Sequence, residues 1–170
     1  RQYRSALDLG CGTGLCGPVV APYARRLWGV DLSQGMLDKA QARQAYDALE
    51  KAELVAFLEG AQSASFDLIV SADTLCYFGE LQAAFRAAAK ALRPAGWLVF
   101  TTEAADAAQG AGFQLQPNGR YCHRLAYLRE ALAAAGLAVH DLQRAPLRSE
   151  AGQPVQGWVV ACQKEAPRSF

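Results

Sequence analysis

The feature that most constrains the fold is a glycine-rich turn, LDLGCGTGLCGP at residues 7–18, which places four glycines in eight positions directly after a short apolar run. A strand that leads into glycines and then a helix presents backbone N–H groups and a positive helix end at the carboxyl edge of a sheet. Open α/β folds bind their ligands at this edge. The spacing fits two templates, Gly10-x-Gly12-x-Gly14 and the dinucleotide pattern Gly12-x-Gly14-x-x-Gly17. The glycines alone therefore do not decide the ligand.

Around this turn, short apolar runs alternate with longer stretches of helical periodicity. The alternation predicts an α/β fold with a mostly parallel sheet, right-handed crossovers and helices on both faces. The expected strands are 4–9, 27–32, 66–73 and 97–103, and the expected helices are 15–26, 33–49 (capped by Ser33) and 81–92. A further strand falls at either 48–53 or 53–59, and the first choice leaves LVAFLEGA as a short helix.

The pattern changes after residue 105. Residues 106–119 have the composition of a loop, and 125–135 is expected to be a helix that Gly136 ends. The runs 137–145 and 154–163 are strand-like and leave no room between them for a crossover helix, so they are predicted to pair as an antiparallel hairpin. Residues 165–170 are expected to form a frayed tail.

Length, charge and cysteine content limit the class of protein. The 170 residues, 52% of them hydrophobic, suffice for one α/β domain, expected to cover 1–164. Seventeen basic and sixteen acidic residues without a basic cluster predict no nucleic-acid partner. No apolar run approaches the roughly 20 residues of a membrane span, and no signal peptide is apparent, so no membrane partner is expected and a cytoplasmic location is predicted. Five cysteines without ligand spacing indicate reduced thiols and no metal site.

Three features separate the possible ligands. Asp8 ends the first strand, where it favours a cationic amino group and would repel a pyrophosphate. Asp31 ends the next strand, where a carboxylate can accept hydrogen bonds from two ribose hydroxyls. This feature supports an adenosine-containing ligand but does not distinguish one such ligand from another. Pro18 and the terminal hairpin count against a dinucleotide-binding sheet, and the catalytic Tyr–Lys pair of an NAD-dependent oxidoreductase is not found.

Four motifs in order, LDLGCGTG, VDLS, FDLIVSADTLCYF and LRPAGWLVFTTE, resemble those of the class I S-adenosylmethionine-dependent methyltransferases, over Ala6 to Lys164. More narrowly, DTLCYFGEL and GRYCHRLAYLREALAAAGL resemble the methyltransferase domain of predicted bacterial tetratricopeptide-repeat methyltransferases. The resemblance implies a Rossmann-like seven-stranded sheet in the order 3-2-1-4-5-7-6 with strand 7 antiparallel, in agreement with the hairpin inferred from the residues.

The resemblance also implies a binding site for S-adenosylmethionine and its product S-adenosylhomocysteine. The glycine turn and Asp8 would surround the methionine moiety, Asp31 would bind the ribose, and Leu32 would flank the adenine. Ser71 would offer its backbone carbonyl to the amino group, and Glu53 would contact the adenine amine, which favours 48–53 as the third strand. The complete predicted cofactor set is Asp8, Gly10, Cys11, Gly12, Gly14, Asp31, Leu32, Met36, Glu53, Leu54 and Ser71.

The sequence departs from the family at two points. Glu53 replaces a more usual aspartate. The first strand starts almost at residue 1, where these enzymes have helices that cover the cofactor, so the N-terminal lid helices are expected to be absent. Either the native chain is longer, with an upstream domain, or the pocket is unusually open.

Candidates for catalysis lie after the fourth and fifth strands and before the last helix. Methyl transfer is an in-line displacement, and a base is needed only when the acceptor must lose a proton. Asp73 and Tyr77 are predicted to face the acceptor, with a turn cap and a pocket wall as their structural alternatives. His123 is predicted as a base or acceptor anchor, with a purely structural histidine as its alternative. Glu103 is predicted to contact a cationic acceptor, with a solvated carboxylate at the end of a strand as its alternative.

The sequence thus predicts a methyltransferase that transfers a methyl group to an O, N or C nucleophile of an unidentified acceptor, expected to be a small molecule. The alternative is a non-catalytic S-adenosylmethionine-binding or regulatory module of a larger protein.

Overall fold

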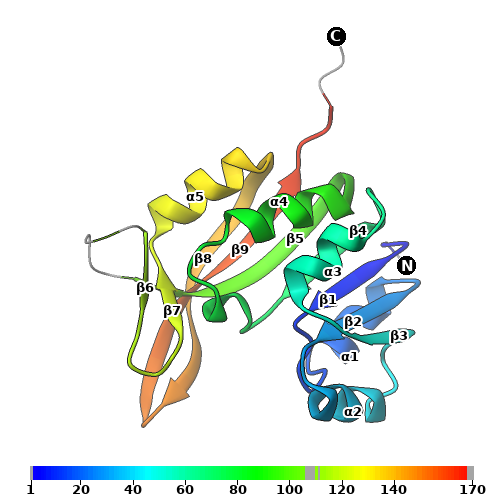
Figure 1. Cartoon of the computed structure of the whole chain (residues 1–170), viewed down its shortest axis with the longest axis horizontal. Coiled ribbons are helices and arrows are strands. Elements are labelled where there is room, and N and C mark those ends of the chain that lie inside the picture. Colours follow the sequence, from blue (N-terminus) through cyan, green and yellow to red (C-terminus); the bar gives the residue numbers. More distant parts are fainter. Residues whose placement is uncertain (1, 106–109, 111, 168–170) are drawn as a thin grey trace.

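The computed structural model describes residues 2–105, 110 and 112–167 (Figure 1). In chain order, the elements are β1 (Ala6–Leu9), α1 (Gly17–Val20), the 3₁₀ helix η1 (Ala21–Tyr23), β2 (Leu27–Asp31), α2 (Gln34–Ala42), β3 (Ala48–Lys51), α3 (Leu54–Gly60), β4 (Phe66–Ser71), η2 (Leu75–Tyr77), α4 (Gln82–Ala91), β5 (Leu92–Ala104), β6 (Phe113–Leu115), β7 (Tyr121–His123), α5 (Leu125–Ala134), β8 (Leu137–Glu150) and β9 (Gln153–Lys164).

The strands form one sheet with the predicted core order. From one edge, β3, β2, β1, β4 and β5 follow each other in parallel, then β9 pairs antiparallel with β5, and β8 pairs antiparallel with β9. Numbered by their place among the seven predicted strands, this is the order 3-2-1-4-5-7-6. The α/β class, the parallel core and the terminal hairpin are therefore confirmed.

A second hairpin, β6–β7, was not predicted and corrects both the loop expected over 106–119 and the expected seven strands, because the sheet in the described residues has nine. Its strands pair antiparallel, and β7 pairs in parallel with the end of β5. Glu103 of β5 faces Cys122 on one side and Gly157 of β9 on the other, so β7 lies on the edge of β5 beyond the end of β4. Three-residue strands give too weak a local pattern to predict, because pairing with β5 fixes them. Residues 106–109 and 111 lie outside the described part of the chain.

Two predicted helices are shorter than expected. The helix predicted over 15–26 is a four-residue α1 followed by η1, with a proline at the start of each. The helix predicted over 33–49 ends at Ala42, although Ser33 does cap it by accepting a hydrogen bond from the Met36 N–H at 3.3 Å. Gln44 has a φ of +56°, and this reversal frees Tyr46 to pack beneath the glycine turn.

The other predicted elements agree closely with the structure. Helices α4 and α5 match the predictions, and β3 confirms the preference for a strand within 48–53. Strand β5 begins at Leu92, five residues before the predicted start, with an irregular register opposite the beginning of β4. Residues 165–167 are exposed and follow the last strand, and 168–170 of the predicted tail lie outside the described residues.

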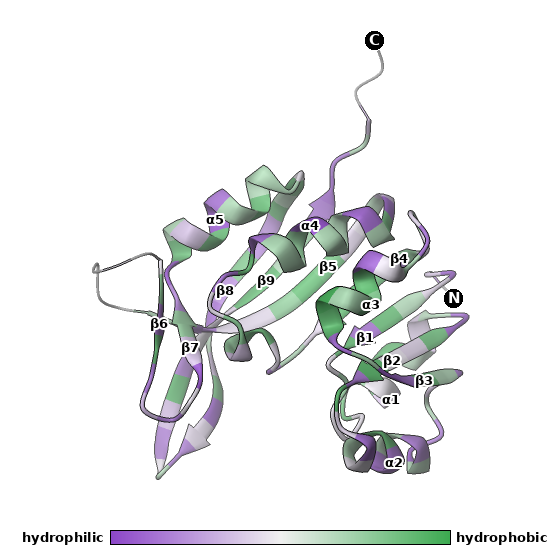
Figure 2. Cartoon of the chain, in the orientation of Figure 1, coloured by the Kyte–Doolittle hydropathy of each residue, from purple (hydrophilic) through white to green (hydrophobic). Residues whose placement is uncertain are grey.

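Successive residues of each strand point to opposite faces, and this divides the core into two layers. Helices α3, α4 and α5 cover one face, where Phe85 packs on Phe100 with ring centroids 5.2 Å apart (Figure 1). On the other face, Ala6, Val20 and Leu27 pack together beside α1. Figure 2 shows apolar residues concentrated along β5 and the helices that cover it. The carboxyl ends of β1, β2 and β4 all lead into one edge of this sandwich.

Within the described residues, the structure contains no helix that is both long and apolar enough to cross a membrane.

Candidate cofactor and acceptor site

The glycine turn adopts backbone conformations that favour glycine. Gly10, Gly12 and Gly14 have φ values of +75°, +53° and +84°. A Cβ on Gly10 would lie 2.3 Å from the Thr74 side chain, whereas a Cβ on Gly12 would meet no atom within 4 Å. The backbone at Gly12 therefore borders open space, and a ligand can approach it closely.

A cavity of about 710 Å³ opens at this turn. Its lining comes from the carboxyl ends of β1, β2 and β4 and from the starts of α2 and α3, the edge at which open α/β sheets bind ligands. Of the predicted site residues, Asp8, Gly10, Cys11, Gly12, Asp31, Leu32, Met36, Glu53, Leu54, Asp73 and Tyr77 line it. Sequence reasoning missed Thr13, Leu15, Cys16, Ser33, Ala72, Thr74 and Phe78, which lie within or next to the quoted motifs.

Asp8 is the buried acid of the cavity. Its side chain is 1% exposed and accepts a 2.6 Å hydrogen bond from the Tyr46 hydroxyl. Burial raises the pKa of Asp8 to about 6, the Tyr46 hydrogen bond opposes this rise, and the nearby Asp31 carboxylate adds to it. A carboxylate in this position gains strongly from a cationic partner.

Asp31 fixes the shape of the turn. One of its oxygens accepts a hydrogen bond from the Gly12 N–H at 3.0 Å and the other from the Ser33 N–H at 2.9 Å. From the end of α2, Arg43 Nε donates to the Thr13 carbonyl at 2.7 Å. Each carboxylate oxygen of Asp31 retains a second lone pair, which a ligand hydroxyl can use.

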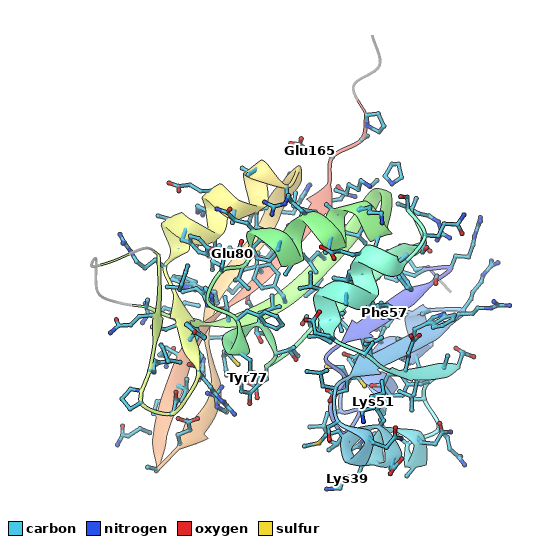
Figure 3. The ribbon with its side chains drawn as sticks, viewed as in Figure 1. Lys39, Lys51, Phe57, Tyr77, Glu80 and Glu165 are labelled. Atoms are coloured by element: carbon cyan, nitrogen blue, oxygen red, sulfur yellow. The ribbon has the colours of Figure 1, made fainter. Side chains whose placement is uncertain are left out.

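Exposed apolar side chains surround the cavity. Leu15, Leu32, Met36 and Tyr77 line it and are 69%, 60%, 42% and 57% exposed. Gathered large apolar groups of this kind mark a binding surface. Tyr77, the last residue of η2, is labelled in Figure 3.

Glu53 and Cys11 have structural roles within the lining. Both oxygens of Glu53 cap α3 by accepting hydrogen bonds from the Val55 and Ala56 N–H groups at 3.1 and 2.7 Å. Burial, helped by the charges of Asp8 and Asp31, raises the pKa of the Cys11 thiol to about 12, so it stays protonated and unreactive at neutral pH.

Three predicted site residues do not line the cavity. Gly14 faces Ala40 and Tyr46 in the packing beneath the turn. Ser71 is buried, and its hydroxyl donates to the Leu9 carbonyl at 2.9 Å, which ties β4 to β1. The third is His123, which lies in a different part of the fold.

His123 is fully buried at the junction of β5, β7 and the loop after η2. Its Nε2 lies 2.9 Å from the Gly79 carbonyl and its Nδ1 lies 2.6 Å from the Thr102 hydroxyl. Because a carbonyl can only accept, Nε2 carries the proton and Nδ1 accepts from Thr102. Burial lowers the pKa of His123, which keeps the ring neutral. This placement is at odds with a base facing the acceptor and matches the structural alternative.

Beside the cavity, three carboxylates and two arginines form a charged wall that consists of Asp73, Glu103, Arg120, Arg148 and Glu150. Arg148 of β8 contacts Glu103 and donates to Asp73 at 2.9 Å and to Glu150 at 3.1 Å. Glu103 is 2% exposed, which corrects the expectation of a solvated carboxylate. The Arg120 guanidinium stacks over the Tyr77 ring at 5.5 Å. The wall thus joins both hairpins to the Asp73 side of the cavity.

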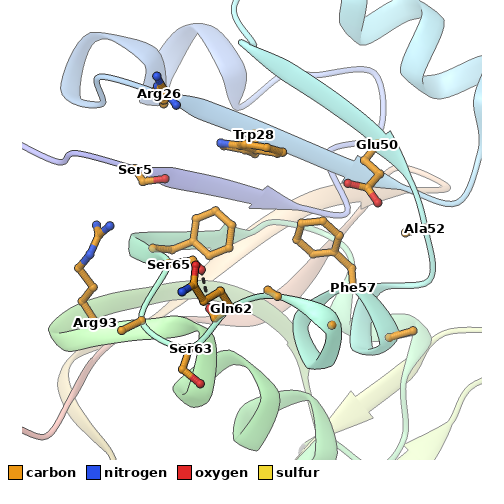
Figure 4. Close-up of a pocket in the computed structure, with 15 residues that line it drawn as sticks. Ser5, Arg26, Trp28, Glu50, Ala52, Phe57, Gln62, Ser63, Ser65 and Arg93 are labelled. Carbon is orange, nitrogen blue, oxygen red and sulfur yellow. Dashed lines mark hydrogen bonds between the residues drawn. The ribbon is translucent and has the colours of Figure 1, made fainter.

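A second cavity of about 770 Å³ lies elsewhere (Figure 4). It is lined by residues at the starts of strands, including Ser5, Arg26, Phe66 and Arg93, together with Trp28 and Phe57. Amino ends of strands are the opposite edge from the usual ligand site of this architecture. None of the predicted site residues lines it.

Comparison with known proteins agrees with this geometry. A family model described as "Methyltransferase domain" matches residues 7–100. The chain is 36% identical over 106 residues to a malonyl-[acyl-carrier protein] O-methyltransferase of Enterobacter lignolyticus. The matched segment covers 62% of this chain and 41% of that protein. It is 32% identical to a ubiquinone biosynthesis O-methyltransferase of Idiomarina loihiensis, which covers 58% and 42%. The chain thus spans about two-fifths of the length of these relatives.

Solved structures show the same fold. A S-adenosylmethionine-dependent methyltransferase of Methanosarcina mazei superposes with a TM-score of 0.79 at 15% identity, which covers 98% of this chain and 95% of the other. The [4+2]-cyclase SpnF superposes with a TM-score of 0.80 at 18% identity, over 96% and 75%. Fold alone does not decide the reaction, because one fold can host several chemistries.

The fold and the glycine turn at the carboxyl ends of the strands define a class I, S-adenosylmethionine-dependent methyltransferase domain. The chain belongs to the methyltransferase domain family whose model it matches. The site fits S-adenosylmethionine, since a buried acid, an open left-handed Gly12 and the Asp31 carboxylate suit an ammonium group, a close backbone contact and a ribose. The narrower resemblance to tetratricopeptide-repeat methyltransferases stays a prediction.

Proposed function

We propose that this domain binds S-adenosylmethionine in the 710 Å³ cavity and transfers its methyl group to a small-molecule acceptor. The observation that carries the proposal is the arrangement of Asp8 and Asp31 on either side of the open backbone at Gly12. The names of the O-methyltransferase relatives support an oxygen acceptor.

Each lining residue has a defined part in this proposal. Asp8 neutralises the cofactor's ammonium group, and Asp31 accepts hydrogen bonds from the ribose hydroxyls. Leu32 and Met36 supply apolar contacts for the adenine. Asp73 and Tyr77 face the acceptor, with the Asp73 carboxylate available to contact it and Tyr77 forming a wall.

Asp8, Asp31 and the Gly12 backbone would hold S-adenosylmethionine, which when bound would supply an electrophilic methyl group for displacement by the acceptor's lone pair, with the carbon–sulfur bonding electrons left on sulfur. The protein's contribution is to hold the acceptor in line and to exclude water. The exposed apolar side chains Leu15 and Tyr77 at the rim are placed to do the latter.

The test is calorimetric titration of the chain with S-adenosylmethionine, S-adenosylhomocysteine and NAD. We expect binding of the first two and none of NAD. The Asp31→Ala variant should bind the first two ligands about 1–3 kcal/mol more weakly, since the hydroxyls lose a charged partner. Asp38→Ala, which removes an exposed carboxylate from α2, is the matched control and should bind normally. Unchanged affinity in Asp31→Ala would remove Asp31 from the site, and NAD binding would contradict the proposal.

Turnover distinguishes an enzyme from the alternative, a non-catalytic binding module. Release of S-adenosylhomocysteine in the presence of an acceptor supports the enzyme, whereas tight cofactor binding without transfer to any acceptor supports the module.

We also propose a cytoplasmic location, which five cysteines outside any disulfide in the described part of the chain support, because reduced thiols persist in reducing compartments. A domain boundary at 164 and an upstream domain in the native chain stay predictions. The upstream domain is supported by a 36% match to a biotin biosynthesis bifunctional protein of Saccharophagus degradans, which covers 18% of that protein.

A further inference from the structure

The charged residues that line the cavity are all acidic. Its charged residues are Asp8, Asp31, Glu53 and Asp73, and the described residues that line it include no lysine or arginine. Three of these acids have partners or roles on the cofactor side: Asp8 meets Tyr46, Asp31 holds the turn, and Glu53 caps α3. Asp73 is the acid that remains on the acceptor side.

Asp73 is also the exposed member of the charged wall. Its side chain is 51% exposed and that of Glu150 is 40% exposed, whereas those of Arg120 and Arg148 are 20% and 18% exposed. The Arg120 Nη1 atom is buried and lies 3.5–3.9 Å from all three carboxylates of the wall. Among the described residues, Asp73 is the member of the wall that lines the cavity, so a ligand in the cavity reaches its carboxylate without passing the two arginines.

The wall carries an excess of negative charge. Its three carboxylates and two arginines sum to a formal charge of −1. Hydrogen bonds from Asn118 and Arg148 lower the pKa of Glu150, so this carboxylate is ionised at neutral pH. Oxygen Oδ1 of Asp73 faces Arg148 and Arg120, and the half-exposed carboxylate remains available on the cavity side. Such a field attracts cations and disfavours anions.

We propose that the acceptor of this domain carries a cationic group, such as a protonated amine, which binds against Asp73 near Tyr77, in the negative field to which Glu150 contributes. This inference rests on the proposed function, since it describes the acceptor side of the same cavity. Asp73 is then the specificity-determining residue, and Arg148 is a positioning residue that holds it from β8.

The test uses protein saturated with S-adenosylhomocysteine, so that cofactor binding is established before the acceptor side is probed. Tyramine, tyrosol and 4-hydroxyphenylacetate share a phenol ring and a short carbon arm and differ in the charge of the end group. We expect tyramine to bind at least about tenfold more tightly than the other two, because a hydrogen bond to a charged partner is worth about this factor. Asp73→Asn and Glu150→Gln should each reduce this preference.

Asp141→Asn is the matched control, because it removes an exposed carboxylate from the same strand as Arg148 but outside the wall. It should keep the full preference. Equal affinity for the three probes, a preference for 4-hydroxyphenylacetate, or no binding of any probe by the loaded protein would overturn the inference. If S-adenosylhomocysteine itself fails to bind, the proposed function is what fails.

A competing use of the negative charge is to balance the cofactor's sulfonium. In that case Asp73→Asn would weaken binding of S-adenosylmethionine but not of the uncharged thioether S-adenosylhomocysteine, and the three probes would bind alike. That combined result would contradict a cationic acceptor.

Discussion

At the scale of single residues, the cavity depends on a buried carboxylate and on a glycine with a left-handed backbone. Asp8 is a carboxylate almost without solvent, and its charged form has one hydrogen bond, from Tyr46. Gly12 holds a left-handed backbone conformation beside open space. Burial of Asp8 costs stability when the cavity is empty, whereas glycine adopts this conformation without strain, and both features are suited to a ligand that supplies a positive charge and a close backbone contact.

The raised pKa of Asp8 predicts a pH-dependent affinity. With a pKa of about 6 in the empty protein, the carboxylate must lose its proton to neutralise an ammonium group. We expect the affinity for S-adenosylhomocysteine to be about tenfold weaker one pH unit below that value than at neutral pH. Calorimetry across this range checks it. Tyr46→Phe, which removes a hydrogen bond that lowers the pKa, should move the midpoint upward, and Asp8→Asn should abolish the dependence.

The raised pKa of Asp8 affects folding stability in the opposite direction: its contribution to stability falls as the pH rises, whereas the ligand affinity rises. Because the pKa of Asp8 in the folded state lies above its ordinary value of 3.8, Asp8 favours folding fully below about pH 4, and this contribution is lost as the pH rises through about 6. Asp8→Asn should therefore raise the free energy of unfolding at neutral pH, by about 1–3 kcal/mol. A drop in stability for this variant in denaturant unfolding would contradict burial as the origin of the shift.

Gly12 offers a prediction with a close control. Gly12→Ala should weaken cofactor binding, because its Cβ enters the open space, and should lower stability by about 1–2 kcal/mol, because φ is +53°. Gly119→Ala, at a φ of +81° in the β6–β7 turn and also without neighbours, should cost similar stability and leave affinity unchanged. Equal affinities of the two variants would show that the Gly12 backbone does not border the ligand.

At the scale of secondary-structure elements, side-chain contacts reinforce the backbone pairing that joins the β6–β7 hairpin to β5 and β8 to β9. Strand β7 pairs with only the last two residues of β5, Glu103 and Ala104. His123 reinforces this junction through Thr102 of β5 and the Gly79 carbonyl, and Arg148 joins β8 to Glu103. The Asp73 side of the cavity therefore depends on contacts between distant parts of the chain.

His123→Ala tests this structural role. The variant loses a buried ring and two hydrogen bonds, so the free energy of unfolding should fall by about 2–4 kcal/mol. Cofactor affinity should stay within about twofold of the original, because His123 does not line the cavity. Denaturant unfolding and calorimetry measure the two effects. A variant of full stability that binds cofactor but has lost all turnover would instead restore His123 as the base.

At the scale of the whole molecule, cofactor binding should stabilise the fold. A ligand at about a hundred times its Kd adds about 2.7 kcal/mol to the free energy of unfolding, which for a domain of this size raises Tm by about 5–10 °C. Scanning calorimetry with S-adenosylhomocysteine should show this rise, and NAD at the same concentration should not. An equal shift with both ligands would contradict selectivity for the methyl donor and its product.

The sequence by itself determined the features that short-range patterns encode. The glycine turn, the acids that end β1 and β2, the parallel βα units and the terminal hairpin each lie within one or two elements, so apolar periodicity and turn residues suffice to predict them. Eleven of the fourteen predicted site residues line the cavity, since most of them lie within the motifs at the ends of these strands.

Only the tertiary structure decided the features that depend on contacts between distant segments. Tyr46 leaves its predicted helix because its hydroxyl reaches Asp8, 38 residues earlier. The pairing of β7 with β5 turns a predicted loop into a hairpin, and Arg148 withdraws Glu103 from solvent across 45 residues. In each case the energy comes from burial and hydrogen bonding between groups far apart in the chain, and no local pattern of residues records which partners will meet.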